Sequence, residues 1–216
     1  MPLFRLCLFL IVLTVSNVQP VPANNTSESA LRLLVLGDSL SAGYGLQPED
    51  SFPAQLEDAI YDAGYDVRVI NAGVSGDTTA GGLSRLDWAL ADKPHIVLVE
   101  LGGNDALRGL PPAETFANLD AILARLKNHD ISVILAGMRA PRNLGDDYAT
   151  AFDAVYPRLA QKYDLPFYPF FLQGVALDPA LNQADGIHPN ARGVKEIVRR
   201  ILPLLETELK KVRMDY

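Results

Sequence analysis

The sequence predicts one domain of the α/β class, built as three α/β/α layers around a parallel sheet. Two observations predict it: short apolar runs recur along the chain, and amphipathic stretches separate them. Strand and helix alternate in this way when crossover helices cover both faces of a parallel sheet. With 216 residues, of which 49% are hydrophobic and 21% charged, the chain has an ordinary globular composition.

Five apolar runs are the expected strands. They are largely continuous rather than alternating, and most are rich in β-branched residues, which is typical of strands buried on both faces. The runs cover residues 31–37, 67–73, 95–103, 131–137 and 165–171. Ligands of open parallel sheets bind beyond the carboxyl ends of the strands, so the residues that follow each run are the candidates for function.

Amphipathic stretches lie between and after these runs. Residues 51–64, 116–126 and 147–163 carry apolar side chains at helical spacing. A last helix is expected over residues 194–209, with Pro203 inside it as the cause of a kink. No internal repeat or long linker interrupts the pattern, which favours a single domain.

The chain before the first strand has the composition of a secretory signal peptide. Residues 1–23 combine one basic residue with an apolar run, and Val21 and Ala23 stand at positions −3 and −1 of a cleavage site. An uncleaved membrane anchor is the alternative, although the apolar run falls short of the roughly 20 residues that span a bilayer. We expect cleavage, a flexible lead-in over 24–30 and one domain over 31–212, in a periplasmic or secreted protein without a stable membrane anchor.

Charge and cysteine content argue against several classes of protein. The formal net charge is −7, and an acidic domain repels a phosphate backbone, so no nucleic-acid partner is expected. The single cysteine, Cys7, lies in the expected signal peptide, so the mature domain would hold no disulfide. Three scattered histidines argue against a zinc site. Neither a GxGxxG nor a GxxxxGK motif occurs in the sequence, so a nucleotide cofactor is not indicated. We therefore expect no metal.

Three groups suited to acyl transfer follow the first and fifth runs. Ser39 lies in GDSLS directly after the first run, and Asp185 and His188 lie three residues apart in DGIHPN. A serine hydroxyl becomes a nucleophile when an imidazole accepts its proton, and a carboxylate holds that imidazole in the required tautomer. The sequence therefore predicts a catalytic triad of Ser39, His188 and Asp185.

Donors for the negative charge that develops on the substrate carbonyl oxygen follow several of these runs. Gly76 offers a backbone N–H with no side chain in the way, Asn104 offers a side-chain amide, and the Ser39 N–H is a third donor. One such side-chain amide is worth about 2.7 to 4 kcal/mol. The plainer alternative is that a serine after a strand is a turn residue and a lone histidine an ordinary surface or core group.

Other polar residues near these turns are interpreted as structural. His95 opens the third strand, and His129 ends a helix, where its charge suits the helix dipole. The remaining members of this set are interpreted as turn, capping or loop-bracing residues: Asp38, Ser41, Ser75, Thr78 and Asp105.

Four motif blocks in this order resemble those of the GDSL or SGNH hydrolases. They are GDSLS at 37–41, SGDT with Gly76, GGND with Asn104, and DGIHPN at 185–190, and the resemblance runs from about residue 31 to 210. Further stretches, VELGGNDALRG, MRAPRNLG and YPRLAQKYDLP, resemble the bacterial periplasmic thioesterase, lysophospholipase and arylesterase group. The resemblance implies a flavodoxin-like five-stranded sheet of order 2-1-3-4-5, the triad and oxyanion donors named above, and action on esters and thioesters without a cofactor.

The loop ALRGLPP (106–112) matches the segment that covers the acyl chain in the resembling group. Leu107, Leu110 and Pro111 would then form a groove wall, where each buried methylene contributes about 0.8 kcal/mol, or roughly fourfold in binding. The alternative is an exposed loop whose leucines only pack on the domain.

The expected function is a monomeric serine hydrolase that cleaves carboxylic esters and thioesters through an acyl-enzyme. Its partners would be small-molecule acyl esters, thioesters or lysophospholipids. A carbohydrate O-acetyl esterase is one alternative, because an acetyl ester needs the same machinery and only a different pocket. A catalytically silent binding domain on the same fold is the other.

Overall fold

Five parallel strands form one sheet in the order β2-β1-β3-β4-β5, which confirms the predicted order. This computed structural model describes residues 31–214, so the predicted signal peptide (1–23) and lead-in (24–30) lie outside the described residues. The strands are β1 (Leu31–Gly37), β2 (Val67–Gly73), β3 (Ile96–Glu100), β4 (Ser132–Ala136) and β5 (Phe167–Tyr168).

Two of the strands are much shorter than the sequence predicts. The run 95–103 leaves the sheet after Glu100, and Gly102, with a φ of 113°, caps the helix that follows. The run 165–171 contributes only two residues, which lie between Pro166 and Pro169. A proline has no N–H to donate to a neighbouring strand, so prolines on both sides limit this edge strand.

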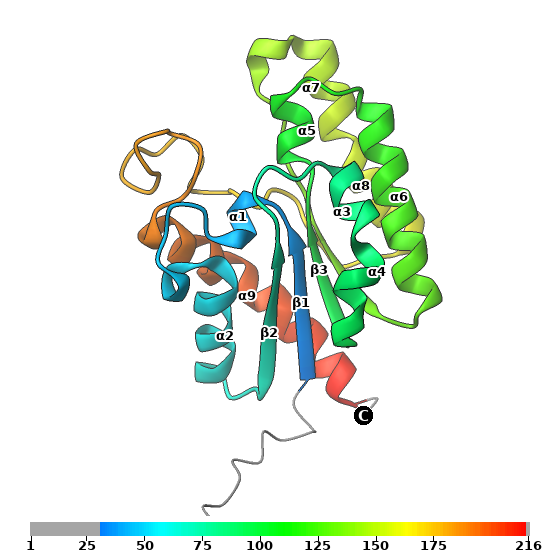
Figure 1. Ribbon diagram of the computed structural model, residues 1–216, viewed down its shortest axis with the longest axis vertical. Coiled ribbons are helices and arrows are strands. Elements are labelled where there is room, and N and C mark those ends of the chain that lie inside the picture. The colour runs from blue at the N-terminus through cyan, green and yellow to red at the C-terminus, as the bar shows by residue number, and fades with distance from the viewer. Residues whose placement is uncertain (1–30, 215–216) are drawn as a thin grey trace, which may run out of the picture.

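Helices cover both faces of the sheet, which confirms the α/β/α class. They are α1 (Ser39–Ala42), α2 (Phe52–Asp62), α3 (Thr79–Ser84), α4 (Leu86–Ala89), α5 (Gly103–Leu107), α6 (Pro112–Asn128), α7 (Asp146–Asp153), α8 (Val155–Tyr163) and α9 (Ala191–Met214), with short 3₁₀ turns η1 (Pro48–Asp50), η2 (Leu90–Asp92) and η3 (Arg142–Leu144). In Figure 1, α2 and α9 lie on one face, and α3, α4, α6 and α8 lie on the other. Within residues 31–214 no helix has the length and apolar content needed to cross a bilayer.

The helix predicted over 147–163 is two helices, and this prediction was wrong. The break falls at Ala154, between α7 and α8. Pro157 follows it and has no N–H with which to bond the carbonyl oxygen of Asp153 four residues earlier. The side chain of Asp153 also connects the break to the loop after β4, because its carboxylate accepts from the Ala140 N–H (2.9 Å) and from Arg142 (2.8 Å).

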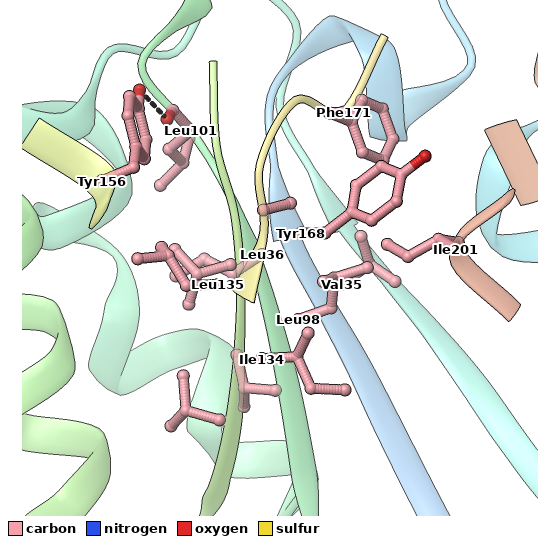
Figure 2. Packing of buried hydrophobic residues seen from close by; sticks show 14 of the residues in the cluster. Val35, Leu36, Leu98, Leu101, Ile134, Leu135, Tyr156, Tyr168, Phe171 and Ile201 are labelled. Carbon is pink, nitrogen blue, oxygen red and sulfur yellow. Dashed lines mark hydrogen bonds between the residues drawn. The ribbon is translucent and has the colours of Figure 1, made fainter. Parts of the chain in front are cut away.

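Apolar side chains of the strands fill the space on both sides of the sheet (Figure 2). Leu36 points to the side of Tyr156 in α8, whereas Val35 and Leu98 point to the side of Ile201 in α9. All five side chains are buried. Burying a side chain of this size stabilises a fold by about 1.5 to 3 kcal/mol, so the sheet is a rigid support for the loops at its carboxyl edge.

Candidate active site

Loops at the carboxyl ends of β1 and β5 bring Ser39 and His188 together, although they are 149 positions apart in the chain. His188 Nε2 lies 3.0 Å from Ser39 Oγ, and His188 Nδ1 lies 2.7 Å from Asp185 Oδ2. The three residues that the sequence predicted as a triad therefore form one continuous series of hydrogen bonds. Each distance is within the range needed for direct proton transfer.

The turn that carries Asp185 and His188 is held by the aspartate itself. Asp185 Oδ1 accepts from the backbone N–H groups of Ile187 (2.9 Å) and His188 (3.0 Å), which leaves Oδ2 for the imidazole. The His188 and Ile187 N–H groups, followed by the His188 side chain, lower the pKa of Asp185 to about 2. This carboxylate is therefore ionised wherever the protein is near neutral pH.

Ser39 is the first residue of α1, and Asp38 is the N-cap of that helix. Asp38 Oδ1 accepts from the Leu40 N–H at 3.0 Å, so the interpretation of Asp38 as a capping residue is confirmed. Gly37, which precedes it, has no room for a side chain, because an added Cβ would overlap Ser41 Oγ. The Gly-Asp-Ser sequence thus places the hydroxyl of Ser39 on a tight turn at the end of β1.

Gly76 lies in the loop after β2, and Asn104 is the second residue of α5, where it lines the same pocket as Ser39. Neither the Ser39 N–H nor the Gly76 N–H has an acceptor among the described residues, so both are available to an oxygen of a bound ligand. Gly76 has a φ of 84°, and an added Cβ would contact only Arg108 Nη2 at 3.7 Å. Glycine is therefore needed here for its backbone conformation rather than for space.

The amide of Asn104 is already engaged. Its Nδ2 donates to Asp38 Oδ2 (3.0 Å) and to the carbonyl oxygen of Asp77 (2.9 Å). An amide nitrogen has only two hydrogens, so a ligand oxygen must share or displace one of these bonds. The sequence predicted Asn104 as a donor but not that Asp38 and Asp77 hold it in place.

A second carboxyl group, Glu100, lies buried behind the nucleophile at the end of β3. Glu100 Oε2 accepts from Ser41 Oγ (2.6 Å) and more weakly from the Asp38 N–H (3.4 Å), whereas Oε1 has no partner among the described residues. Burial, and secondarily the charge of Asp38, holds the pKa of Glu100 well above its usual range. Burial thus favours the neutral form of Glu100, which braces the turn through Ser41 and the Asp38 N–H.

Burial also raises the pKa of Asp38, to about 6, against the opposing effect of the Leu40 N–H and the Asn104 amide.

Sequence analysis did not single out Glu100. The signal was present: IVLVE is a fully apolar strand that ends in an acid, and a buried acid at the carboxyl edge of a sheet needs a reason.

Three other residues interpreted as structural, Thr78, Asp105 and His129, occupy structural positions. Thr78 Oγ1 accepts from the Gly81 N–H (3.3 Å) as the N-cap of α3, and Asp105 Oδ2 accepts from the Thr79 N–H (2.9 Å). His129 is the C-cap of α6.

Sequence analysis missed Tyr44, whose ring centroid lies 4.6 Å from that of His188.

A pocket of about 680 Å³ opens beside Ser39, Asn104 and His188. Its walls are mostly apolar and include Leu107, Met138, Phe170, Leu172, Leu177 and Ile187. Leu110 and Pro111, which the sequence predicted as groove wall with Leu107, are not among its lining residues. The Leu110 carbonyl oxygen accepts instead from the Tyr148 hydroxyl (2.9 Å), and Pro111 is the N-cap of α6.

Comparison with known proteins agrees with this architecture. The chain matches the GDSL-like Lipase/Acylhydrolase family over residues 35–195. It is 46% identical over 159 residues to thioesterase 1/protease 1/lysophospholipase L1 of Escherichia coli (strain K12), covering 73% of this chain and 75% of the relative. It is 44% identical over 164 residues to the arylesterase of Vibrio mimicus, covering 76% and 82%.

A solved structure gives the same result. The crystal structure of AlinE4, an SGNH-hydrolase family esterase, superposes with a TM-score of 0.72 at 50% identity, covering 85% of this chain and 99% of that one. The sheet order and the residues at its carboxyl edge define an SGNH-type ester hydrolase. The chain belongs to the GDSL-like lipase/acylhydrolase family.

Proposed function

We propose that the protein hydrolyses acyl esters and thioesters, including lysophospholipids, with Ser39 as nucleophile, His188 as general base and Asp185 as the group that orients the imidazole. One observation carries the proposal: His188 lies 3.0 Å from Ser39 Oγ through one ring nitrogen and 2.7 Å from Asp185 through the other. This is the arrangement that activates a serine hydroxyl for attack on a carbonyl carbon.

Acylation begins when Ser39 Oγ attacks the substrate carbonyl carbon and His188 Nε2 takes the hydroxyl proton. The carbonyl oxygen becomes negative and binds the N–H groups of Ser39 and Gly76. Asn104 adds its amide by sharing a hydrogen that otherwise bonds Asp38 or the Asp77 carbonyl oxygen. The tetrahedral adduct then collapses, the bond to the leaving group breaks, and His188 gives its proton to the departing oxygen or sulfur.

Deacylation repeats these steps with water. His188 takes a proton from the water as it attacks the acyl-enzyme, and the proton passes to Ser39 Oγ as the carboxylic acid leaves. The ionised Asp185 stabilises the imidazolium in both half-reactions. A His188 ring that already carries this proton cannot accept the one from Ser39, so the reaction begins from the neutral imidazole.

The pocket beside Ser39 favours an acyl chain over an acetylated sugar. A sugar needs polar groups that match its hydroxyls, whereas this pocket is lined mainly by aliphatic and aromatic side chains. The names of the two curated relatives, a thioesterase/lysophospholipase and an arylesterase, support the same substrate classes. A carbohydrate O-acetyl esterase remains the alternative outcome of a substrate panel.

The decisive experiment combines active-site labelling with that panel. A fluorophosphonate should label the wild type and the Ser75→Ala variant but not Ser39→Ala, because Ser75 is an exposed serine of the neighbouring loop. Aryl esters, acyl thioesters and lysophospholipids of increasing chain length should be cleaved by the two labelled proteins only. Labelling that survived in Ser39→Ala, or activity confined to acetylated sugars, would reject the proposal.

Leu107 is the proposed contact for the acyl chain, and Leu110 provides a matched control on the same loop. Leu107→Ala should lower kcat/KM for long acyl esters about fourfold or more, since buried methylenes are lost, and should leave acetate esters nearly unchanged. Leu110→Ala should show no such dependence on chain length, because Leu110 does not line the pocket. Equal losses on short and long esters in Leu107→Ala would reject the contact.

We also propose that residues 31–212 form a single monomeric domain that reaches the periplasm or the exterior after removal of residues 1–23. The apolar run and small-residue exit in the sequence support this. The mature chain should begin near Asn24 by terminal sequencing. Sedimentation at several concentrations should give a single species of monomer mass.

A further inference from the structure

Leu177, in the segment between β5 and α9, is held in an unfavourable position. Its backbone has a φ of 66°, and its side chain is 92% exposed. A left-handed backbone is an outlier for a bulky residue, and an exposed aliphatic side chain gains nothing from burial. Neither feature stabilises the fold, so the position calls for a functional explanation.

The conformation of Leu177 is fixed by neighbouring hydrogen bonds. The buried Asn182 amide donates to the carbonyl oxygens of Val175 (2.7 Å) and Asp178 (2.8 Å), which lie on the two sides of Leu177. The Asp178 carboxylate accepts from the Ala180 N–H (2.9 Å). In Figure 1 the gold and orange segment before α9 extends beyond the body of the domain, on the side where the strands end.

Leu177 belongs to a group of exposed aliphatic side chains around the catalytic pocket. Leu107, 54% exposed, and Ile187, 47% exposed, line the same pocket, and we call these three residues the apolar rim. They come from different loops, yet they surround one opening, inside which Ser39 lies. Exposed aliphatic side chains that gather in this way mark a surface for interaction.

Positive charge accompanies the apolar rim. The charged lining residues besides the buried Asp38 are Arg139 and Arg142. Arg142 pairs with Asp153 at 2.8 Å, whereas Arg139 stacks over the Phe170 ring at 5.1 Å and has no carboxylate partner among the described residues. In a chain of net charge −7, exposed arginines next to the apolar rim suit anionic phosphate groups.

We propose that the apolar rim docks the catalytic pocket onto a phospholipid surface, with Leu177 entering the acyl-chain boundary and Arg139 facing a headgroup phosphate. Aliphatic side chains beside basic residues are the combination that holds proteins at a lipid interface. Docking would place the pocket opening where lipid substrate is concentrated. This role of docking rests on the proposed function, but docking itself requires no hydrolysis.

Vesicle binding in a Ser39→Ala background tests the inference without consuming lipid. Replacing Leu177 by glycine removes the side chain and also relieves the positive φ, so the variant should fold at least as well as its parent. Leu177→Gly should lower partition into vesicles of phosphatidylcholine and phosphatidylglycerol about tenfold or more. Tyr61→Ser, an exposed aromatic position beside the start of β2, is the matched control and should bind as the parent does.

The charge contribution has its own variant. Arg139→Gln should weaken binding about fivefold on vesicles that contain phosphatidylglycerol and much less on phosphatidylcholine alone. Unchanged vesicle binding in Leu177→Gly would overturn the inference. A lipid-free dimer that Leu177→Gly dissociates would also overturn it, because the apolar rim would then bind a second copy. Hydrolysis of a soluble aryl ester by the active enzyme tests the proposed function separately, so the two failures are distinguishable.

Discussion

The two segments that meet at the candidate active site are held in opposite ways. The nucleophile segment (residues 37–41) is packed against the end of the sheet, with Asp38 and Ser41 buried and Glu100 behind them. The histidine segment (residues 185–188) lies mostly at the surface and is held by hydrogen bonds within its own turn. The buried segment depends on the core for its geometry, whereas the exposed one depends on local hydrogen bonds within residues 183–188.

The carboxyl groups of the two segments differ in the same way. Burial raises the pKa of Asp38 to about 6, whereas two backbone N–H groups and the imidazole lower the pKa of Asp185 to about 2. An acid that must stay ionised to orient an imidazole benefits from exposure and N–H donors. An acid that braces a turn inside the protein can be near neutral without loss of that role.

The largest effect is expected from a substitution in the histidine segment, Asp185→Asn, which should act on the rate rather than on the fold. In Asp185→Asn, the remaining oxygen can still accept from the Ile187 and His188 N–H groups, so the turn should persist. The new amide faces His188 Nδ1 and favours the tautomer that cannot accept the Ser39 proton, which should lower kcat about 10⁴-fold.

Kinetics with a soluble aryl ester, together with the melting temperature, check this prediction. Asp178→Asn is the matched control, because Asp178 also accepts from a backbone N–H two residues on but lies outside the triad. A kcat for Asp185→Asn within tenfold of the wild type would mean that the short bond to His188 has no catalytic role.

The next largest effect is expected at Asn104, the side-chain donor to the oxyanion, which also bonds Asp38 of the nucleophile segment. Asn104→Ala should lower kcat about 10² to 10³-fold, because one side-chain donor to the oxyanion is lost. KM should change little, since the bond strengthens in the transition state. Asn128→Ala, at the exposed end of α6, should leave both constants unchanged. A larger change in KM than in kcat would contradict the oxyanion role.

A smaller effect, on stability rather than on rate, is expected at Glu100 behind the buried segment. Two substitutions of Glu100 test whether it braces the turn as a neutral or as a charged group. Glu100→Ala leaves the Ser41 hydroxyl and the Asp38 N–H without an acceptor and should lower the free energy of unfolding by about 1 to 3 kcal/mol. Glu100→Gln keeps the shape and an acceptor and should cost much less. Urea denaturation near neutral pH measures both. An equally large loss in both variants would show that Glu100 works as a charged group.

The last expected effect is a dependence of stability on pH. The pKa of Asp38 rises on folding from 3.8 to about 6, so between these values the folded protein holds more protons than the unfolded one. The contribution of Asp38 to stability is therefore complete below pH 4 and is lost as the pH rises through 6. Asp38→Asn should lose less stability than the wild type across this interval. Parallel curves for the two proteins would contradict the raised pKa.

Much of the fold and the site follows from local sequence. The sheet could be predicted because continuous apolar runs such as 31–37 and 131–137 leave few alternatives to buried parallel strands. Ser39, Gly76 and Asn104 could be placed near one another because parallel strands bring their carboxyl ends to one edge. The last helix was expected over 194–209 and runs from Ala191 to Met214.

Details that depend on contacts through space could not be read from spacing. The single helix predicted over 147–163 breaks at Ala154, where Asp153 bonds a distant loop. Leu107 and Leu110 look alike on the chain, yet only Leu107 lines the pocket.

The sequence by itself determined which chemical groups are available and at which edge of the sheet they gather, because hydrophobic periodicity and turn residues act over a few positions. The tertiary structure decided their electrostatic state: that Asp38 is buried while Asp185 is exposed, and that Asn104 is already held by Asp38. A pKa depends on burial and on neighbours that are distant in the chain, and only the packed structure brings those neighbours together.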